Sequence, residues 1–466
     1  MFYAQRRAKH LSAARYRPTL EPLEQRVLLT IDLLGAPTWV EQGPGPILNT
    51  GGYGMDSQQN PAAGAINAIA PDPYDANVLY VATVNGGVWK TTDATNLNPT
   101  WTPLTDNLAS LSMGCIAFSP LDTNTLYAGS ARVSSYGSDG GPLMGLIKTT
   151  DGGSTWSVLA SSTLANHQVT SVVPTALTTS QGQVVLVGTA DDWGGNGGVF
   201  RSDDGGNTFV RMSGGASTGL PDAGVSQLVA DPGNSLRFYA GVPGYGVYRS
   251  TDGGQTWTSI DNGLANLSGS QAIALAVHND ASTGTNAVYV SVSDNTLLGV
   301  YRSADQGNSW APMDLPNAPY SYNQPHMAAD PTDPNVVYVG TYAEQHFRGD
   351  ASQPAGSQWT SVDGANAGNS APHSDSRSLA FDANGNLLES DDGGIYRLLT
   401  PDDPATRKWQ AVVGDLRITE MHWASYDSLN HTIFGGTQDN ANPTQQSSGN
   451  LVWGQAQGGD GGFTQV

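Results

Sequence analysis

Carboxylates that could take part in chemistry are concentrated between residues 373 and 460. They stand in four short stretches, "PHSDSRS", "ESDDGGIY", "GGTQDNAN" and "GGDGG". Hydrolysis of a glycosidic bond needs two such groups across a cleft, one to donate a proton and one to act as base or nucleophile. The candidates for catalysis are Asp375, Asp392, Asp439, Asp460 and, beside them, His373. Asp391 precedes Asp392 and is a candidate of the same kind.

Other side chains could bind a ligand near these carboxylates. The candidates are His326, Arg377, Gln438, Asn440, Trp193 and Trp423. A cluster of His, Asp, Asn and Gln can serve catalysis, hold a cation or bind sugar hydroxyls. The alternative is that each Asp or Asn only caps a turn, as many do along this chain. Their concentration in one part of the chain favours a site.

A repeat of about fifty residues must position these groups. Eight units can be counted, and each opens on an apolar run, such as "AINAIAPDP" from residue 65, "VSQLVADP" from 225 and "SRSLAFD" from 376. Three further runs rich in β-branched and aromatic residues follow in each unit, so the unit is four antiparallel strands. Such a unit is the blade of a β-propeller. The predicted fold is all-β, a β-propeller of about seven to ten four-stranded blades.

Parts of the repeat are irregular. The sixth unit, after Tyr342, and the eighth, after Asn440, lack a clean turn before the last strand. The stretch "PTWVEQGPGP" near Trp39 predicts a stray outer strand that could complete the last blade, and the tail "GGDGGFTQV" predicts the start of a ninth unit. Equally, the chain could be a fragment of a larger propeller or of a pair of propellers.

A recurring turn separates the third and fourth strands, as in "RSTDGGQTW" from Arg249. The carboxylate of Asp252 is predicted to accept hydrogen bonds from backbone N–H groups just beyond it, while the two glycines supply positive φ. Ser250 and Thr256 can close the same loop, and Trp257 offers an apolar body to the space between blades. Variants of this turn begin at Lys148, Arg201 and Arg302.

These turns resemble the Asp-box of bacterial neuraminidase-type repeats, Ser/Thr-x-Asp-x-Gly-x-Thr-Trp/Phe. The resemblance covers roughly residues 36 to 466. It implies that the repeated carboxylates are structural parts of hairpins on the rim of the propeller, namely Asp151, Asp204, Asp252 and Asp305. Calcium at these turns is the alternative, but no copy has the ligand order of a helix-loop-helix calcium site. No cofactor is therefore expected.

Asp-box propellers occur in sialidases, in xyloglucan-cleaving glycoside hydrolases and in sortilin-type receptors, so the fold alone does not settle function. A sialidase is disfavoured because the usual "RIP" tripeptide is absent and Arg201, Arg249 and Arg302 share one repeat position. The carboxylate stretches resemble signatures of exported glycosyl-hydrolase-like propellers. The resemblance implies an exported propeller that binds or cleaves extracellular polysaccharide with paired carboxylates. The alternative is a non-catalytic, sortilin-like scaffold that binds proteins at the cell surface.

Charge excludes several partners. The formal net charge is −21, and outside residues 1–30 the chain has 14 basic and 39 acidic side chains, a net charge of −25. Such a body repels nucleic acid and anionic lipid surfaces. No stretch has the roughly 18 to 20 apolar residues that span a bilayer. Cys115 is the single cysteine, which excludes an internal disulfide, and we expect it to be a buried thiol.

The amino terminus has a different character. Residues 1–34 are predicted to be a basic, largely disordered segment, followed by the propeller over 35–466. The stretch "LEPLEQRVLL" from Leu20 resembles the amino-terminal LEPR-x-LL motif of exported planctomycete-type proteins. This resemblance implies export or sorting. An amphipathic starter helix without a sorting role is the alternative.

Overall fold

The computed structural model describes residues 40–50, 52–55, 59–135, 137, 139–159, 161–191, 195–317, 326–341, 345–455 and 459–465. The chain divides into two units, Met1–Val40 and Glu41–Val466, and almost all described residues belong to the second. The predicted export segment 1–34, its boundary at residue 35, and Trp193 lie outside the described residues. They remain predictions.

The described chain is almost entirely β-structure, arranged in eight sheets. Seven are four-stranded antiparallel sheets with strands in chain order. The first three are β2 (Ile66–Pro71), β3 (Leu79–Thr83), β4 (Val88–Thr91) and β5 (Trp101–Pro103); β6 (Met113–Ser119), β7 (Asp122–Ser130), β8 (Leu146–Thr149) and β9 (Ser157–Leu159); and β10 (Val169–Thr178), β11 (Gln183–Thr189), β12 (Gly198–Ser202) and β13 (Val210–Arg211). A helical turn, α1 (Ser161–Leu164), joins the second to the third.

The next four sheets repeat this order. They are β14 (Gln227–Asp231), β15 (Asn234–Val242), β16 (Gly246–Ser250) and β17 (Thr258–Ser259); β18 (Ala272–Asp280), β19 (Thr285–Ser293), β20 (Leu297–Ser303) and β21 (Ala311–Met313); β22 (His326–Ala329), β23 (Val336–Gly340), β24 (His346–Asp350) and β25 (Trp359–Ser361); and β26 (Ser378–Phe381), β27 (Leu387–Ser390), β28 (Ile395–Leu399) and β29 (Lys408–Ala411). Short 3-10 turns occur at Leu267–Gly269 and Ala365–Ala367.

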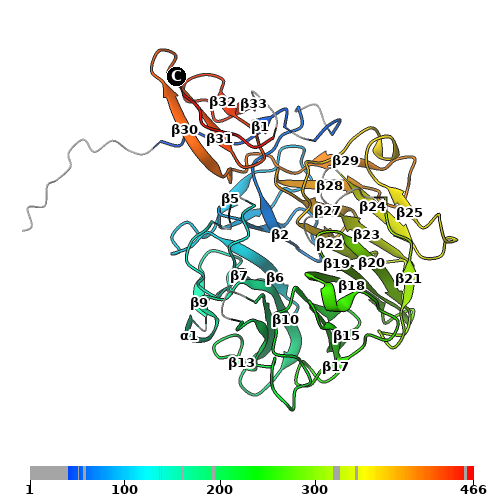
Figure 1. Ribbon diagram of the computed structural model, residues 1–466. Helices are drawn as coiled ribbons and strands as arrows, with labels where there is room; N and C mark the ends of the chain where they lie inside the picture. The colour runs from blue at the N-terminus through cyan, green and yellow to red at the C-terminus, as the bar shows by residue number, and fades with distance from the viewer. Residues whose placement is uncertain are drawn as a thin grey trace, which may run out of the picture. The chain divides into compact units, whose positions relative to one another are not determined.

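The seven sheets form a closed ring. The first strands β2, β6, β10, β14, β18, β22 and β26 pack against one another in turn, and β26 packs against β2. Figure 1 shows the sheets following one another in chain order around this ring. Apolar clusters fill the spaces between neighbouring sheets, and one of them joins the first sheet to the sixth and seventh. The predicted β-propeller is confirmed, and its ring contains seven blades.

The eighth predicted unit forms a sheet outside the ring. It consists of β30 (Met421–Asp427), β31 (Thr432–Thr437), β32 (Pro443–Gln445) and β33 (Trp453–Gln455), and β1 (Ile47–Leu48) pairs with β33 in parallel. An amino-terminal strand therefore completes the last sheet; it is formed by residues 47–48, while Trp39 lies outside the described residues. The strand does not close the ring, because β26 and β2 already do so. No strand forms over residues 459–465, so a ninth unit does not begin in this described part of the tail.

The repeated turns have the predicted hydrogen bonds. Asp252 Oδ1 accepts the backbone N–H of Thr256 at 2.9 Å and the hydroxyl of Ser250 at 2.8 Å. The same Ser250 hydroxyl accepts the N–H of Gly254 at 2.9 Å, and Gly253 and Gly254 have φ of 79° and 84°. The indole N–H of Trp257 donates to the Gly254 carbonyl at 3.2 Å. The carboxylates at Asp151, Asp204 and Asp305 make the same bonds.

A tyrosine on the second strand of a blade fastens the turn of the next blade. The Tyr80 hydroxyl donates to the Gly152 carbonyl at 2.8 Å, and Tyr127 donates to Gly205 at 3.1 Å. The third strand adds a basic residue, as where Arg249 Nη1 donates to the Gln306 carbonyl at 2.6 Å. Each turn therefore links two neighbouring blades through hydrogen bonds. The repeated arginines make part of these bonds, which is the structural role expected for them.

We expect the Asp252→Ala variant to lower the free energy of unfolding by about 1–2 kcal/mol, because it removes the acceptor that closes a turn. Urea denaturation measures this loss. Gln255→Ala in the same turn is the matched control, since its exposed side chain donates only to the Asp252 carbonyl oxygen and its loss is expected to be within about 0.5 kcal/mol. Equal losses in both variants would contradict the assigned role of the carboxylate.

Two smaller predictions can also be compared with the structure. Cys115 is buried, and burial raises the pKa of its thiol to about 12, so the group stays protonated as an inert packing residue. In the part of the chain that the structure describes, no helix combines the length and the apolar character needed to cross a membrane.

Candidate functional site

Three of the predicted carboxylates come together from three separate turns. Asp375 precedes β26, Asp392 lies between β27 and β28, and Asp439 follows β31 of the eighth sheet. One oxygen from each lies within 4.8 Å of the others. Asp375 and Asp439 have positive φ of 69° and 53°, an uncommon conformation that non-glycine residues keep where the surrounding structure enforces it. The cluster therefore sits where the seventh blade meets the eighth sheet.

Arg377 sets the charge of Asp392. Its guanidinium Nε donates to Asp392 Oδ1, and Arg377 is itself held by the Val133 carbonyl at 3.0 Å and the Ser135 hydroxyl at 2.7 Å. The Asp392 carboxylate is only 1% exposed. Burial alone would raise the pKa of Asp392, but Arg377 and the amide of Gln438 outweigh burial and lower it. Asp392 is therefore a fixed negative charge.

Asp439 has the opposite character. It is half-buried, and its Oδ2 accepts the Gln438 amide Nε2 at 3.0 Å. Burial, together with the neighbouring carboxylates of Asp392 and Asp375, raises the pKa of Asp439 to about 8. Carboxylates this close cannot all ionise at neutral pH, so one proton is retained on Asp439. The same spacing would suit a divalent cation, but Arg377 and Gln438 already occupy Asp392, and we assign no metal here.

The other predicted polar residues surround these three. Asp460 is exposed, and its Oδ1 accepts the backbone N–H of Asp439 at 3.1 Å. The Asn440 amide donates to the Asp392 carbonyl oxygen at 2.8 Å, and Gln438 Nε2 bridges Asp392 and Asp439 at 3.0 Å each. Gln438 and Asn440 are buried. They fasten the eighth sheet to the seventh blade.

The two predicted histidines take supporting positions. His373 is buried and packs on Gly393, where a Cβ would lie 2.5 Å from the His373 Cβ; its Nδ1 lies 3.2 Å from the Ser374 carbonyl oxygen. Burial and the positive charge of Arg377 lower the pKa of His326 to about 4, so that imidazole is neutral near pH 7. Among the described residues, neither histidine makes a hydrogen bond to any of the three carboxylates.

An exposed aromatic pair lies on the eighth sheet. Trp423 on β30 is 45% exposed, and Phe463 is 89% exposed. Their rings meet edge to face with centroids 4.9 Å apart, and the Trp423 indole donates to the Thr464 carbonyl at 2.8 Å. Phe463 follows Asp460 by three residues. Sequence analysis proposed Trp423 and missed Phe463, although a lone aromatic in a glycine-rich tail is a signal that could have identified it.

A second group of ionisable side chains is buried behind the site. His346 Nδ1 lies 3.3 Å from Asp363 Oδ1, and its Nε2 lies 3.5 Å from Glu389 Oε1. Burial lowers the pKa of His346, but Asp363 and Glu389 outweigh burial and raise it to about 10. Burial and Glu389 raise the pKa of Asp391 well above its usual range. His346, Asp363 and Glu389 were not predicted from the sequence.

Asp391 connects this buried group to the cluster. Its Oδ1 accepts the backbone N–H groups of Gly393 at 2.7 Å and Gly394 at 2.9 Å. These bonds close the turn that carries Asp392, so Asp391 shapes the site. The neighbouring carboxylates in "ESDDGGIY" therefore have different surroundings and different charge states.

Sequence comparison finds one informative relative. No family model matches the chain. A xyloglucanase of Hypocrea jecorina is 25% identical over 295 residues, which are 60% of this chain and 29% of that protein. The match therefore spans less than a third of the relative.

Solved structures with a similar fold include three GH74 proteins. An ancestral GH74 enzyme has a TM-score of 0.60 at 16% identity, with 87% of this chain and 55% of that chain covered. The GH74 xyloglucanase of Xanthomonas campestris has a TM-score of 0.59 at 18% identity, covering 88% and 62%. The GH74 enzyme of Niastella koreensis has a TM-score of 0.58 at 18% identity, covering 87% and 61%. At these identities the likeness shows the fold, and the chain is a β-propeller protein.

Proposed function

We propose that the chain binds and hydrolyses a polysaccharide at the cluster of Asp375, Asp392 and Asp439. The observation that carries this proposal is the half-buried carboxyl of Asp439, whose pKa is raised to about 8 by burial and by its neighbours. A general acid must hold its proton at the working pH and release it in the transition state. Asp439 has this property, and it lies beside an ionised carboxylate, Asp392.

In this proposal Asp439 protonates the glycosidic oxygen as the bond to the sugar breaks. The second carboxylate is Asp375 or Asp460. Asp375 is in contact with Asp439, so no water molecule fits between the two carboxyls. An inverting pair needs carboxyls about 6.5–9.5 Å apart to hold that water, so the spacing of Asp375 and Asp439 does not suit an inverting mechanism. Asp460 is exposed, and its carboxylate accepts the backbone N–H of Asp439. Asp392, paired with Arg377, keeps the proton on Asp439.

Three further observations support a polysaccharide as substrate. The relative with detectable sequence identity is a xyloglucanase. Trp423 lies on the sheet that supplies Asp439, and Phe463 of the tail packs against it; both rings are exposed and can stack on a sugar ring. A net charge of −25 outside residues 1–30 favours a neutral polymer over an anionic one.

We infer two finer points from sequence resemblance. The repeated turns are Asp-boxes, which is supported by their hydrogen bonds at Asp151, Asp204, Asp252 and Asp305. The chain is exported, which is supported by the likeness of "LEPLEQRVLL" to the amino-terminal motif of exported proteins. Fractionation of cells that produce the chain tests the second point, because an exported chain is recovered outside the cell.

A polysaccharide screen tests the proposed function. Full-length protein is incubated with xyloglucan, other β-glucans, xylan and mannan, and released reducing ends are measured. We expect cleavage of at least one polymer. The rates of Asp375→Asn and Asp460→Asn are then compared on that polymer. The variant that removes the base or nucleophile is expected to cleave the polymer about 100-fold or more slowly than the unmodified chain. The other variant is expected to lose less rate.

Asp252→Asn is the matched control, because this carboxylate closes a rim turn and is expected to leave turnover unchanged. Binding without turnover on every polymer would overturn the enzymatic part of the proposal and favour a non-catalytic scaffold. Unchanged turnover in both site variants and in Asp439→Asn would instead overturn the assignment of the site.

A further inference from the structure

A cavity of about 700 Å³ opens at the end of the ring opposite the acidic cluster. It lies where β2, β6, β10 and β14 end. The starts of neighbouring first strands are bonded to one another, as where the Ser226 hydroxyl donates to the Ile273 carbonyl at 2.7 Å. The starts therefore share one end of the ring and the ends share the other. The acidic cluster precedes β26, which places it at the end where the strands start.

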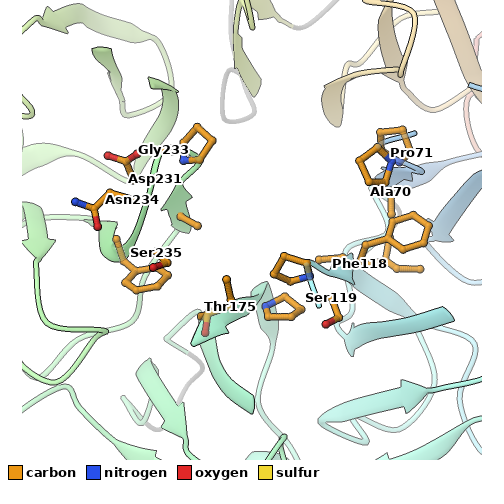
Figure 2. A pocket seen from close by; sticks show the side chains of 18 of the residues that line it. Ala70, Pro71, Phe118, Ser119, Thr175, Asp231, Gly233, Asn234 and Ser235 are labelled. Atoms are coloured by element: carbon orange, nitrogen blue, oxygen red, sulfur yellow. Dashed lines mark hydrogen bonds between the residues drawn. The ribbon is translucent and has the colours of Figure 1, made fainter. Parts of the chain in front are cut away.

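The cavity wall is mainly apolar and rich in proline. Four blades contribute a proline: Pro71, Pro120 and Pro232 end or directly follow the first strand, and Pro174 lies within β10. Ile69, Ile116 and Phe118 add larger apolar surface. Figure 2 shows Pro71, Phe118, Thr175 and Asp231 arranged around one open space. Its size falls within the range of pockets that bind small ligands or short segments of chain.

The polar side chains of the wall are mostly engaged within the protein. Asp231 Oδ1 accepts the amide of Asn279 at 2.6 Å, and its Oδ2 pairs with Arg237 at 3.0 Å. The Thr175 hydroxyl donates to the Val184 carbonyl at 2.8 Å, and the Ser119 hydroxyl accepts the amide of Gln183 at 2.9 Å. A sugar, which needs a hydrogen-bond partner for nearly every hydroxyl, therefore finds few partners here.

The charge around the cavity is negative. Asp231 lines it, but Arg237 pairs with this buried carboxylate and offsets its charge. The negative charge comes from Asp72 and Asp122, which follow the prolines of the first two blades. Among the residues that line the cavity in the described chain, none is Lys, Arg or His. An occupant with negative charge is repelled, and one with positive charge is attracted.

We propose that this cavity binds a short peptide segment that carries apolar side chains together with lysine or arginine. The apolar wall takes the apolar side chains, and the surrounding carboxylates attract the basic ones. The first strand of each blade stands at the edge of its sheet, with one side free of a strand partner in that sheet. An extended peptide can add main-chain hydrogen bonds to such an edge, which a simple amphiphile cannot. This site is separate from the proposed catalytic cluster.

Two synthetic peptides with blocked ends test the proposal on the full chain. One has the sequence Lys-Leu-Pro-Leu-Leu-Lys and the other Glu-Leu-Pro-Leu-Leu-Glu, each with a fluorescent label for anisotropy. We expect the lysine peptide to bind at least about tenfold more tightly than the glutamate peptide, and to weaken when NaCl is raised from about 0.05 to 0.5 M. Dodecyltrimethylammonium, which has charge and an apolar chain but no peptide backbone, is expected to displace it only weakly.

Two exposed alanines allow the cavity to be filled without disturbing the core. Ala176 and Ala230 line the cavity and are exposed. Replacing either by Trp is expected to weaken binding of the lysine peptide at least about tenfold. Val210→Trp, on an exposed outer strand of the same blade as Ala176, is the matched control and should bind normally. Circular dichroism and a normal unfolding curve confirm that each variant is folded.

Several results would overturn the proposal. These are equal binding of the two peptides, normal binding in both alanine variants, complete displacement by the detergent, or displacement by neutral oligosaccharides. Asp439→Asn is expected to bind the lysine peptide as the unmodified chain does. Failure of peptide binding is therefore distinguishable from failure of polysaccharide cleavage.

Discussion

Asp439→Asn is expected to lower the rate of polysaccharide cleavage by about 100- to 10,000-fold, the usual contribution of a general acid. Asn has nearly the shape of the protonated carboxyl and can keep a hydrogen bond within the cluster, so folding is expected to be retained. The amide cannot release a proton to the glycosidic oxygen. The loss is expected in kcat with little change in KM, because only the transition state is affected.

The pH dependence follows from the direction of the pKa shift. The acid must be protonated, and the pKa of Asp439 is raised to about 8, so cleavage is expected to be sustained through neutral pH and to fall above about pH 8. Asp439→Asn is expected to remove this alkaline limb from the pH–rate profile. An aspartate exposed to water would already have lost its proton near the ordinary aspartate pKa of 3.8.

A substrate with a good leaving group separates an acid from a merely structural residue. An aryl glycoside whose phenolate leaves without protonation needs no general acid, so Asp439→Asn is expected to cleave it at close to the normal rate. Asp252→Asn serves as control on both substrates. Equal losses on the polymer and on the aryl glycoside would show that Asp439 only maintains the fold.

The repeated parts of the fold were predictable because their causes are local. The first strand of every unit was located from apolar runs, and the turn at Asp252 was predicted from residue types within nine positions. Closure after seven blades depends on packing between β2 and β26, which are about three hundred residues apart. No local pattern distinguishes the seventh unit, which completes the ring, from the eighth, which lies outside it.

The candidate site was predictable in part. Asp375, Asp392 and Asp439 were selected because they do not belong to the repeated turns, and the structure brings these three together. Their charge states could not be predicted. Asp391 and Asp392 are neighbours in the chain, yet only Asp392 meets a guanidinium, because Arg377 reaches it from another turn. His373, predicted as catalytic, is buried and packs on Gly393, and its role stays a prediction.

The buried group around His346 left a weak signal in the sequence. Glu389 interrupts the apolar run "NLLES" at a position where a buried strand normally carries an apolar side chain. Its partner His346, and Asp363 with which His346 also pairs, lie in the preceding blade, so the pairing depends on how two blades pack. A charged residue in such a run is retained only with a partner, which makes it a useful marker of buried ion pairs.

His346→Gln is expected to lower the free energy of unfolding at pH 6 by about 3–5 kcal/mol, because it leaves Asp363 and Glu389 buried without a counter-charge. The pKa of His346 is raised from the ordinary histidine value of 6.5 to about 10 in the folded protein. A raised histidine pKa gives stability that is fully present below pH 6.5 and is lost as pH rises through about 10. Urea denaturation across this range is expected to show falling stability in the unmodified chain and a flatter profile in the variant.

A double substitution distinguishes the effect of the His346 charge from the effect of its side-chain packing. Removing one member of a buried ion pair is costly because the other charge is stranded, whereas removing both charges is much cheaper. His346→Gln combined with Glu389→Gln is therefore expected to recover about half or more of the loss, giving a coupling energy of about 1–3 kcal/mol. Asp391→Asn, which mimics the protonated carboxyl, is expected to be stabilising at neutral pH, since burial and Glu389 disfavour its ionisation. Additive losses and an unchanged pH profile would mean that His346 acts through its shape and its contact with the Trp409 ring, not through its charge.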